Sequence, residues 1–223
     1  MIIPALNEAK SIGLVIEAIP TQLVRHVIVG DNGSTDNTAQ IAFDKGAIVV
    51  HAQQKGYGTA CLAGMAYIQN LSIKPAIVVF LDGDFSDFPE QLPDIVRPII
   101  EDQMDMVIGS RALGHKEGGS MTLPQKFGNW LATTLIRWIY GYHFTDLGPF
   151  RAIRWDALMS LKMKDPNFGW TAEMQVKAAR KKLKTTEVPV DYRQRVGVSK
   201  VSGTIKGSFL AGYKILLVVF RGR

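Results

Sequence analysis

The first half of the chain alternates between short apolar runs and longer segments with helical periodicity. The apolar runs are rich in β-branched residues, which is typical of strands buried on both faces of a parallel sheet. Such alternation predicts βαβ units, in which right-handed crossover helices join parallel strands. The predicted strands are Ile2–Leu6, Val27–Gly30, Ala47–His51, Ala76–Leu81 and Met104–Ile108, and the predicted helices are Ser11–Ile19, Thr35–Lys45, Thr59–Asn70 and Pro89–Glu101.

The second half follows a different order but shows no linker, internal repeat or low-complexity tract. A chain of 223 residues suits one α/β domain or two small ones, and the missing linker favours a single domain over residues 1–223. The elements expected after Arg111 are a polar loop at Gly114–Met121, a helix at Phe127–Tyr140, an extended segment at Asp146–Arg154, a helix at Trp170–Lys184, a strand at Val188–Arg193, a Gly/Ser-rich loop at Val196–Lys206 and an apolar segment at Phe209–Phe220.

The strand predicted at Ala76–Leu81 runs directly into two aspartates, Asp82 and Asp84, separated by Gly83. Residues two apart in an extended segment point the same way, so both carboxylates are expected to face one point. Gly83 lets a ligand approach the backbone between them. Two hard oxygen ligands that leave coordination positions open suit Mg²⁺ or Mn²⁺ carrying a diphosphate. The alternative is a strand that simply ends in a turn, because Asp and Gly are common turn residues.

A second polar run follows the strand predicted to end at Gly30. Ser34 or Thr35 is expected to cap the following helix, with Asp36 favourable in its first turn. Capping does not account for Asp31, whose carboxylate is expected at the strand end, facing across the sheet edge.

Several polar loops thus follow strands or open helices of the predicted sheet. In open α/β sheets, ligands bind outside the carboxyl ends of the strands. The sequence therefore predicts a ligand site at one sheet edge, built from Asn7-Glu8, Asp31–Ser34, Lys55–Gly58, Asp82–Asp84 and Gly109–Arg111.

The formal charge of +6 is concentrated near the end of the chain. From residue 177 onwards there are 12 Lys and Arg against 2 Asp and Glu, whereas residues 1–176 hold 14 and 18. A basic segment on an acidic body indicates an anionic partner, here expected to be phosphate groups or a membrane surface and not nucleic acid. For Lys177–Lys184 alone, a solvated helix face is the plainer explanation. Cys61 is the only cysteine, which excludes an intrachain disulfide and favours a reducing intracellular compartment.

A series of short motifs runs through the chain in the order Pro4-Ala-Leu-Asn-Glu8, Asp31-Asn-Gly-Ser-Thr-Asp36, Gly56-Tyr-Gly58, Asp82-Gly-Asp84, Gly109-Ser-Arg111, Asp146-Leu-Gly-Pro-Phe-Arg151, Glu173-Met174 and Ser199-Lys200. Together they resemble the family 2 inverting glycosyltransferases, most of all the branch that contains the dolichyl- or polyprenyl-phosphate mannosyl- and glucosyltransferases. The resemblance covers nearly all of the chain. Each motif is common by itself, but their order along one sheet edge is specific.

The resemblance implies a single GT-A domain, a Rossmann-like, mostly parallel sheet flanked by helices. Residues 1–111 would bind a nucleotide sugar and residues 112–223 the acceptor. Mg²⁺ or Mn²⁺ would be held on the donor diphosphate by Asp82 and Asp84. Asp31 would accept a hydrogen bond from the base, and Gly58 would let the ribose lie against the backbone. The residues implied to bind the nucleotide sugar are Pro4, Asn7, Glu8, Asp31, Gly33, Ser34, Gly58, Asp82 and Gly83.

The implied reaction moves a hexose from a GDP- or UDP-sugar with inversion at the anomeric carbon. Arg111 and Lys200 would face phosphate groups, and Asp146 and Glu173 would shape the sugar and acceptor site. A lipid-phosphate acceptor is already ionised and needs little help from a general base. A hydroxyl acceptor would require Asp84, Asp146 or Glu173 to take its proton. The residues implied to act in catalysis are Asp84, Arg111, Asp146, Glu173 and Lys200.

A polyprenyl-phosphate acceptor would bring the protein to a membrane. No stretch reaches the roughly 20 apolar residues that span a bilayer. Phe127–Tyr140, with Trp130 and Trp138, and Phe209–Phe220, with flanking basic residues, are candidates for lying in the interface. The alternative is that both pack on the sheet or on a partner subunit. The expected location is cytoplasmic, on the cytoplasmic membrane face if the acceptor is a lipid.

Other functions remain open at this stage. The acceptor could instead be a soluble or saccharide hydroxyl. A nucleotidyltransferase is disfavoured because no glycine-rich basic loop follows the first strand. A non-catalytic nucleotide-sugar-binding protein is disfavoured by the presence of Asp82, Asp84, Arg111 and Lys200. Asp87 is either a third carboxylate beside the metal or a cap for the helix predicted at Pro89.

Overall fold

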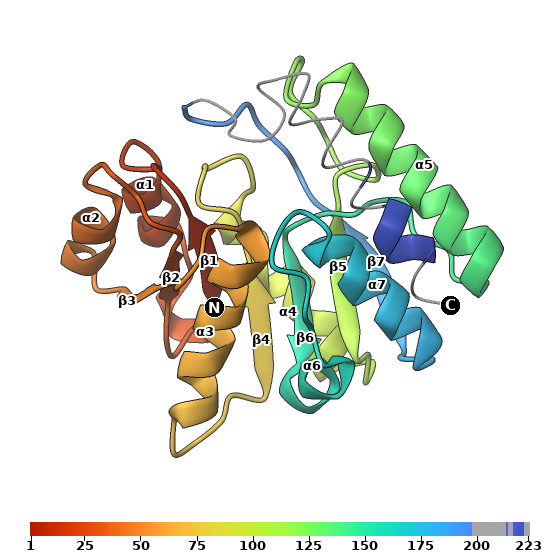
Figure 1. Ribbon diagram of the computed structural model, residues 1–223, viewed down its shortest axis with the longest axis horizontal. Helices are drawn as coiled ribbons and strands as arrows, with labels where there is room; N and C mark the ends of the chain where they lie inside the picture. Colours follow the sequence, from red (N-terminus) through yellow and green to blue (C-terminus); the bar gives the residue numbers. More distant parts are fainter. Residues whose placement is uncertain (198–212, 214–215, 221–223) are drawn as a thin grey trace.

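The computed structural model describes residues 1–197, 213 and 216–220, which form one seven-stranded sheet with helices on both faces (Figure 1). The strands are β1 (Ile2–Ala5), β2 (Ile28–Asp31), β3 (Ile48–His51), β4 (Ile77–Phe80), β5 (Met106–Ser110), β6 (Arg151–Arg154) and β7 (Thr185–Pro189). The α-helices are α1 (Ile12–Glu17), α2 (Thr38–Asp44), α3 (Tyr57–Asn70), α4 (Leu92–Ile100), α5 (Leu123–Tyr140), α6 (Trp155–Leu161) and α7 (Trp170–Arg180), and the 3-10 turns are η1 (Thr21–Leu23) and η2 (Pro89–Gln91).

The sheet has the strand order β3-β2-β1-β4-β6-β5-β7 and is mostly parallel. Strands β1 to β4 pair in parallel, as do β5 and β7. Strand β6 lies antiparallel between β4 and β5. The predicted α/β class is therefore confirmed, with one antiparallel strand that joins the two parallel parts.

Alternate residues of each strand enter two different cores. Ile2 and Phe80 belong to a cluster with α3, α5, α6 and α7, whereas their neighbours Ile3 and Val79 belong to a cluster with α1, α2 and α4. Since successive strand side chains point to opposite faces, continuous apolar strands give a sheet covered on both sides. Trp170 is buried in the first of these clusters and packs edge-on to Phe80, with ring centroids 5.9 Å apart.

Every strand and helix predicted in the first half is present, but α2 begins at Thr38 and not at Thr35. The two residues expected to cap it are hydrogen-bonded elsewhere, because Ser34 Oγ accepts from the Asn7 backbone N (2.9 Å) and Thr35 N donates to Asn7 Oδ1 (2.8 Å). Asp36 precedes the helix, and its carboxylate accepts from Thr38 N at the helix start (3.0 Å) and from Ala9 N (3.2 Å). Asn37 is the N-cap and makes no side-chain capping bond. The capping prediction is wrong because these side chains tie two loops together.

The helices of the second half also differ from prediction at their ends. Helix α5 begins four residues before the predicted Phe127, at Leu123, because Thr122 and Gln125 form a capping box. Helix α7 ends at Arg180, since Lys182 adopts a left-handed conformation with φ 54°.

The strands of the second half differ as well. The strand expected at Val188–Arg193 is β7, which starts at Thr185 in parallel register with β5. Of the extended segment expected at Asp146–Arg154, only Arg151–Arg154 is a strand. Helix α6, which follows it directly, was not predicted because its apolar pattern is only two turns long.

The end of the chain is described in part. The loop predicted at Val196–Lys206 lies outside the described residues from Val198 onwards, and so does half of Phe209–Phe220. Residues 216–220 are helical, and the carbonyl of the buried Val219 accepts a hydrogen bond from Tyr140 Oη on α5 (2.6 Å). No helix within the described part of the chain is long and apolar enough to cross a membrane.

The close packing of α3 on the sheet can be tested by a substitution at Gly30 on β2. A Cβ at this position would lie 2.4 Å from the Ala60 carbonyl oxygen, so Gly30→Ala is expected to lower the free energy of unfolding by about 1–3 kcal/mol. Gly128 on α5 is the matched control, because an added Cβ meets no atom of another element within 4 Å among the described residues. Gly128→Ala should be neutral or stabilising by up to about 1 kcal/mol. Urea denaturation followed by circular dichroism measures both, and equal effects would contradict the packing argument.

Candidate functional site

A cleft of about 300 Å³ lies at the carboxyl ends of β1, β2 and β4. Its walls come from Pro4–Leu6 after β1, Asn32 after β2, Lys55–Tyr57 at the start of α3, and the Asp82–Asp84 loop after β4. Glu8, Asn167, Phe168 and Arg195 complete it. The carboxyl ends of these strands meet at one edge, as the sequence predicts, so the residues of several motifs share one cavity.

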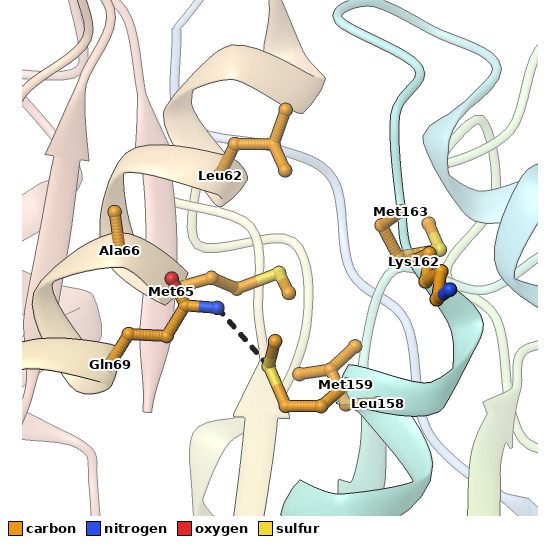
Figure 2. A pocket seen from close by; sticks show the side chains of 8 residues that line it. All are labelled: Leu62, Met65, Ala66, Gln69, Leu158, Met159, Lys162 and Met163. Carbon is orange, nitrogen blue, oxygen red and sulfur yellow. Dashed lines mark hydrogen bonds between the residues drawn. The ribbon is translucent and has the colours of Figure 1, made fainter.

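A second cavity, of about 320 Å³, lies between α3 and α6 (Figure 2). It is mainly apolar, with methionine side chains pointing into it from both helices and the segment that follows α6. Among the described residues, no predicted site residue lines it, and Lys162 is its one charged lining residue. We therefore place the chemistry in the cleft at the sheet edge.

The Asp82 and Asp84 carboxylates both line the cleft. Tyr57 Oη donates to Asp82 Oδ1 (2.9 Å), and Arg195 Nη2 lies 2.8 Å from Asp84 Oδ2. Burial and the neighbouring charge of Asp84 raise the pKa of Asp82 to about 7. Two neighbouring carboxylates with this little solvent around them require a positive charge nearby, and in this structure the Arg195 guanidinium supplies it.

A divalent metal ion fits this pair. Both carboxylates line the cleft, and a cation between them would relieve the repulsion that raises the pKa of Asp82. The Arg195 guanidinium already stands as a positive group against Asp84 Oδ2. Among the described residues, no group of three or more His, Cys, Asp or Glu is arranged to hold a metal ion. The protein would thus supply few ligands and leave the remaining positions to phosphate oxygens and water, as is usual for Mg²⁺.

Asn7 and Ser34 brace the loops beside the cleft. Asn7 N donates to Ser34 Oγ (2.9 Å), and Asn7 Oδ1 accepts from Thr35 N (2.8 Å). Glu8 N donates to Thr38 Oγ1 (2.7 Å), while the Glu8 side chain lines the cleft and lies 3.4 Å from Arg195 Nη2. The loops after β1 and β2 are therefore fixed to each other. Gly33, beyond them, is exposed with φ 79°.

Asp31 is buried at the end of β2, as predicted. Its Oδ2 lies 3.1 Å from His51 Nδ1 on β3, and its Oδ1 accepts from Ser34 N (3.3 Å). The next residue, Asn32, accepts from the Gly56 backbone N (2.8 Å), which ties β2 to the start of α3. The predicted base-binding carboxylate therefore has a fixed orientation.

Gly58 is required by the protein's own packing. A Cβ there would lie 1.9 Å from the carbonyl oxygen of Asp165, so only glycine allows α3 to approach this segment. The predicted contact of Gly58 with a ribose stays a prediction.

Arg111 and Asp146 form a buried bidentate ion pair. Arg111 Nε lies 2.7 Å from Asp146 Oδ2 and Nη2 lies 2.7 Å from Oδ1, while the Arg111 backbone N donates to Oδ2 (2.8 Å). Burial opposes the charge, but Asp146 raises the pKa of Arg111 well above its usual value. The guanidinium lies over the Tyr192 ring, 5.0 Å from its centroid. The structure brings these two predicted catalytic residues together, but neither lines the cleft.

The Glu173 carboxylate on α7 binds backbone N–H groups of a neighbouring segment. Its carboxylate accepts from Lys164 N (3.1 Å) and Asp165 N (2.8 Å), and it pairs with Lys177 (2.7 Å). These bonds fix the segment that leads to Asn167 and Phe168 in the cleft wall. The acceptor role of Glu173 stays a prediction, and Lys200 lies outside the described residues.

Asp87 is buried, and neither carboxylate oxygen has a hydrogen-bond partner among the described residues. Burial and the charge of Asp82 raise its pKa well above the usual value. Phe88, not Asp87, is the N-cap of η2, so the capping alternative is wrong. The metal-side alternative stays a prediction.

The sequence did not identify Tyr57 or Arg195 as site residues. Tyr57 lies within the Lys55–Gly58 loop, but a tyrosine between two glycines gives no sign of its bond to Asp82. Arg195 belongs to the basic end of the chain, and only the tertiary structure brings it to Asp84.

Comparisons with known proteins identify the family of this chain. Residues 1–161 match the model of glycosyl transferase family 2. An uncharacterized glycosyltransferase of Mycobacterium tuberculosis strain H37Rv is 33% identical over 212 residues, which cover 95% of this chain and 93% of that protein. The undecaprenyl-phosphate mannosyltransferase of Micrococcus luteus is 31% identical over 224 residues, covering 92% and 88%.

Solved structures share the fold over the whole chain. The glucosyl-3-phosphoglycerate synthase of Mycobacterium tuberculosis, crystallised with Mn²⁺, UDP-glucose and phosphoglyceric acid, superposes with a TM-score of 0.78 at 23% identity, covering 99% of this chain and 78% of that one. Its fold is the GT-A fold that the motifs predict. Because the family model spans well over half of the residues, the assignment is secure: the chain belongs to glycosyl transferase family 2 and is a glycosyltransferase.

Proposed function

We propose that this glycosyltransferase moves a hexose from a GDP- or UDP-sugar to a polyprenyl-phosphate-type acceptor, with inversion at the anomeric carbon. The observation that carries the proposal is the cleft in which Asp82 and Asp84 lie opposite Arg195 at the sheet edge. A bound divalent ion would supply positive charge to the departing nucleoside diphosphate.

The chain's own residues support the donor side of this proposal. Asp82 and Asp84 would hold the Mg²⁺ or Mn²⁺ ion, and Tyr57 orients Asp82 through its hydrogen bond. The Arg195 guanidinium lines the cleft, where preorganised positive groups would stabilise the charge that develops on the departing diphosphate. Asp31, oriented by His51, would receive the base.

Two observations favour a lipid-phosphate acceptor. The Micrococcus luteus relative is named an undecaprenyl-phosphate mannosyltransferase, and a 29% identical relative from Methanococcus voltae, which covers 98% of this chain, is named for transfer to dolichyl phosphate. In addition, α5 exposes an apolar face with cations beside it, which suits the headgroup region of an anionic membrane. The large apolar residues of this α5 face are Leu123, Phe127, Trp130 and Trp138, 80%, 61%, 59% and 79% exposed.

A soluble hydroxyl acceptor is the second candidate. The structurally similar synthase was crystallised with phosphoglyceric acid, so the fold accommodates soluble acceptors. A hydroxyl acceptor needs a base, whereas Asp146 and Glu173 are both engaged by other groups in this structure. That arrangement favours an acceptor that is already ionised.

Replacement of one metal-binding carboxylate tests the donor site. Asp84→Asn should lower the rate of sugar transfer about 100-fold, because it removes a charged ligand of the metal. Transfer of radiolabelled sugar from GDP-mannose, UDP-glucose or UDP-N-acetylglucosamine to polyprenyl phosphate, in the presence of Mn²⁺, measures this. Asp94→Asn is the control, since Asp94 lies half-exposed on α4, outside the cleft lining, and pairs with Arg97. Wild-type turnover in Asp84→Asn would exclude the proposed metal site.

The α5 face is tested by flotation with liposomes that contain anionic lipid. Replacing Phe127 and Trp138 together by Ser should reduce vesicle binding at least tenfold, because each buried aromatic contributes about 1.5–3 kcal/mol. Phe43→Ser is the matched control, since this phenylalanine is 67% exposed on α2. Equal flotation of both variants and the wild type would contradict membrane contact through α5, and sugar transfer to a soluble polyprenyl-phosphate analogue should be unchanged in all of them.

A further inference from the structure

Arg193 lies beside the loop that carries Asp84, but it does not line the cleft. Its Nε donates to the Phe85 carbonyl oxygen (2.8 Å), and its Nη2 donates to the Asp87 carbonyl oxygen (3.0 Å). Its backbone N donates to the carbonyl oxygen of Ser86 (2.9 Å). One residue therefore binds three successive carbonyl groups directly after Asp84.

The guanidinium is also stacked against two aromatic rings. Its central carbon lies 3.6 Å from the centroid of the Phe85 ring and 4.0 Å from that of Phe88. An arginine over an aromatic face is attracted by the ring quadrupole, and its planar fork still donates in the guanidinium plane. Both rings and two of the carbonyl groups thus depend on a single side chain. A lysine ammonium has neither the plane nor the fork.

The loop held by Arg193 is strained. Phe85 has φ 61°, a left-handed conformation that residues other than Gly, Asn and Asp rarely adopt. Such conformations persist only where the surroundings enforce them. The turn at Phe85 lets the backbone N of Ser86 donate to Asp84 Oδ1 (3.0 Å), so one oxygen of Asp84 is held by its own loop. The other, Oδ2, faces Arg195 and the cleft.

We infer that Arg193 is a positioning residue for the metal site: by clamping the strained backbone of Phe85–Asp87, it aims Asp84 Oδ2 into the cleft. This inference rests on the proposed role of Asp84 as a metal ligand. Arg193 does not line the cleft, and its Nε and Nη2 donate to backbone carbonyl groups of the loop. Its contribution is the orientation of a ligand, which partners outside the coordination sphere of other metal sites also provide.

The test is the affinity for Mn²⁺, measured by water-proton relaxation with and without an excess of UDP or GDP. Arg193→Lys should weaken Mn²⁺ binding about tenfold, within the range seen when a partner outside the coordination sphere is removed. The rate of sugar transfer at saturating Mn²⁺ should stay within about twofold of the wild type, because the occupied site is intact. Excess Mn²⁺ should thus restore the sugar-transfer rate of Arg193→Lys. Excess Mn²⁺ would not restore this rate if the substitution had reduced the amount of folded protein.

Three further proteins complete the test. Phe88→Leu removes one ring but keeps every hydrogen bond of Arg193, and it should weaken Mn²⁺ binding by a smaller factor. Arg97→Lys, an exposed arginine on α4, should bind Mn²⁺ like the wild type. Asp84→Asn tests the metal site itself. If Asp84→Asn loses Mn²⁺ while folded Arg193→Lys binds it normally, the inference about Arg193 is wrong and the metal site stands. If Asp84→Asn binds Mn²⁺ like the wild type, or the wild type binds none, both are overturned.

Discussion

The repulsion between the Asp82 and Asp84 carboxylates is the constraint around which the rest of the cleft is arranged. A strand buried on both faces delivers the two side chains to one point, and burial makes their charges costly. Tyr57 binds one carboxylate, and Arg195 neutralises the other. Tyr57 and Arg195 therefore partly offset the negative charge of a site that we propose binds a metal ion and a diphosphate.

The cleft depends on contacts between distant parts of the chain. The loops after β1, β2 and β4 form one side, and the segments at Asn167 and Arg195 form the other. The second group is held by residues that the family resemblance associates with catalysis, since Glu173 fixes the backbone before Asn167. Likewise, the Arg111–Asp146 pair fixes the end of β5 to the loop before β6. In this structure, these residues act on the site through the backbone that they hold.

Three arginines near the Asp82 and Asp84 carboxylates have different surroundings and therefore different roles. Arg111 is paired with a buried carboxylate, Arg193 is stacked between rings with its donors on carbonyl groups, and Arg195 faces the cleft with one donor unpaired among the described residues. Their sequence contexts do not separate these roles. Of these three arginines, Arg195 alone lines the cleft.

The sequence by itself determined the sheet and the composition of its active edge. Continuous β-branched runs alternating with helices specify a parallel sheet with two covered faces, and polar loops after parallel strands must share an edge. For this reason Asp31, Asp82 and Asp84 could be placed correctly from local patterns alone. The strand boundaries in the second half could not, because β6 and β7 are defined by their pairing with β5 and not by their own periodicity.

The tertiary structure alone decided which partners these residues meet. The capping expected of Ser34 failed because Asn7, from a distant loop, offers its backbone N instead. Gly58 is explained by the Asp165 carbonyl oxygen, and Asp84 by Arg195 and by the turn at Phe85 that Arg193 holds. Such contacts join residues far apart in the chain, and no local periodicity or propensity encodes them. The sequence thus specified the carboxylates of the site, and the folded chain specified their orientation and charge.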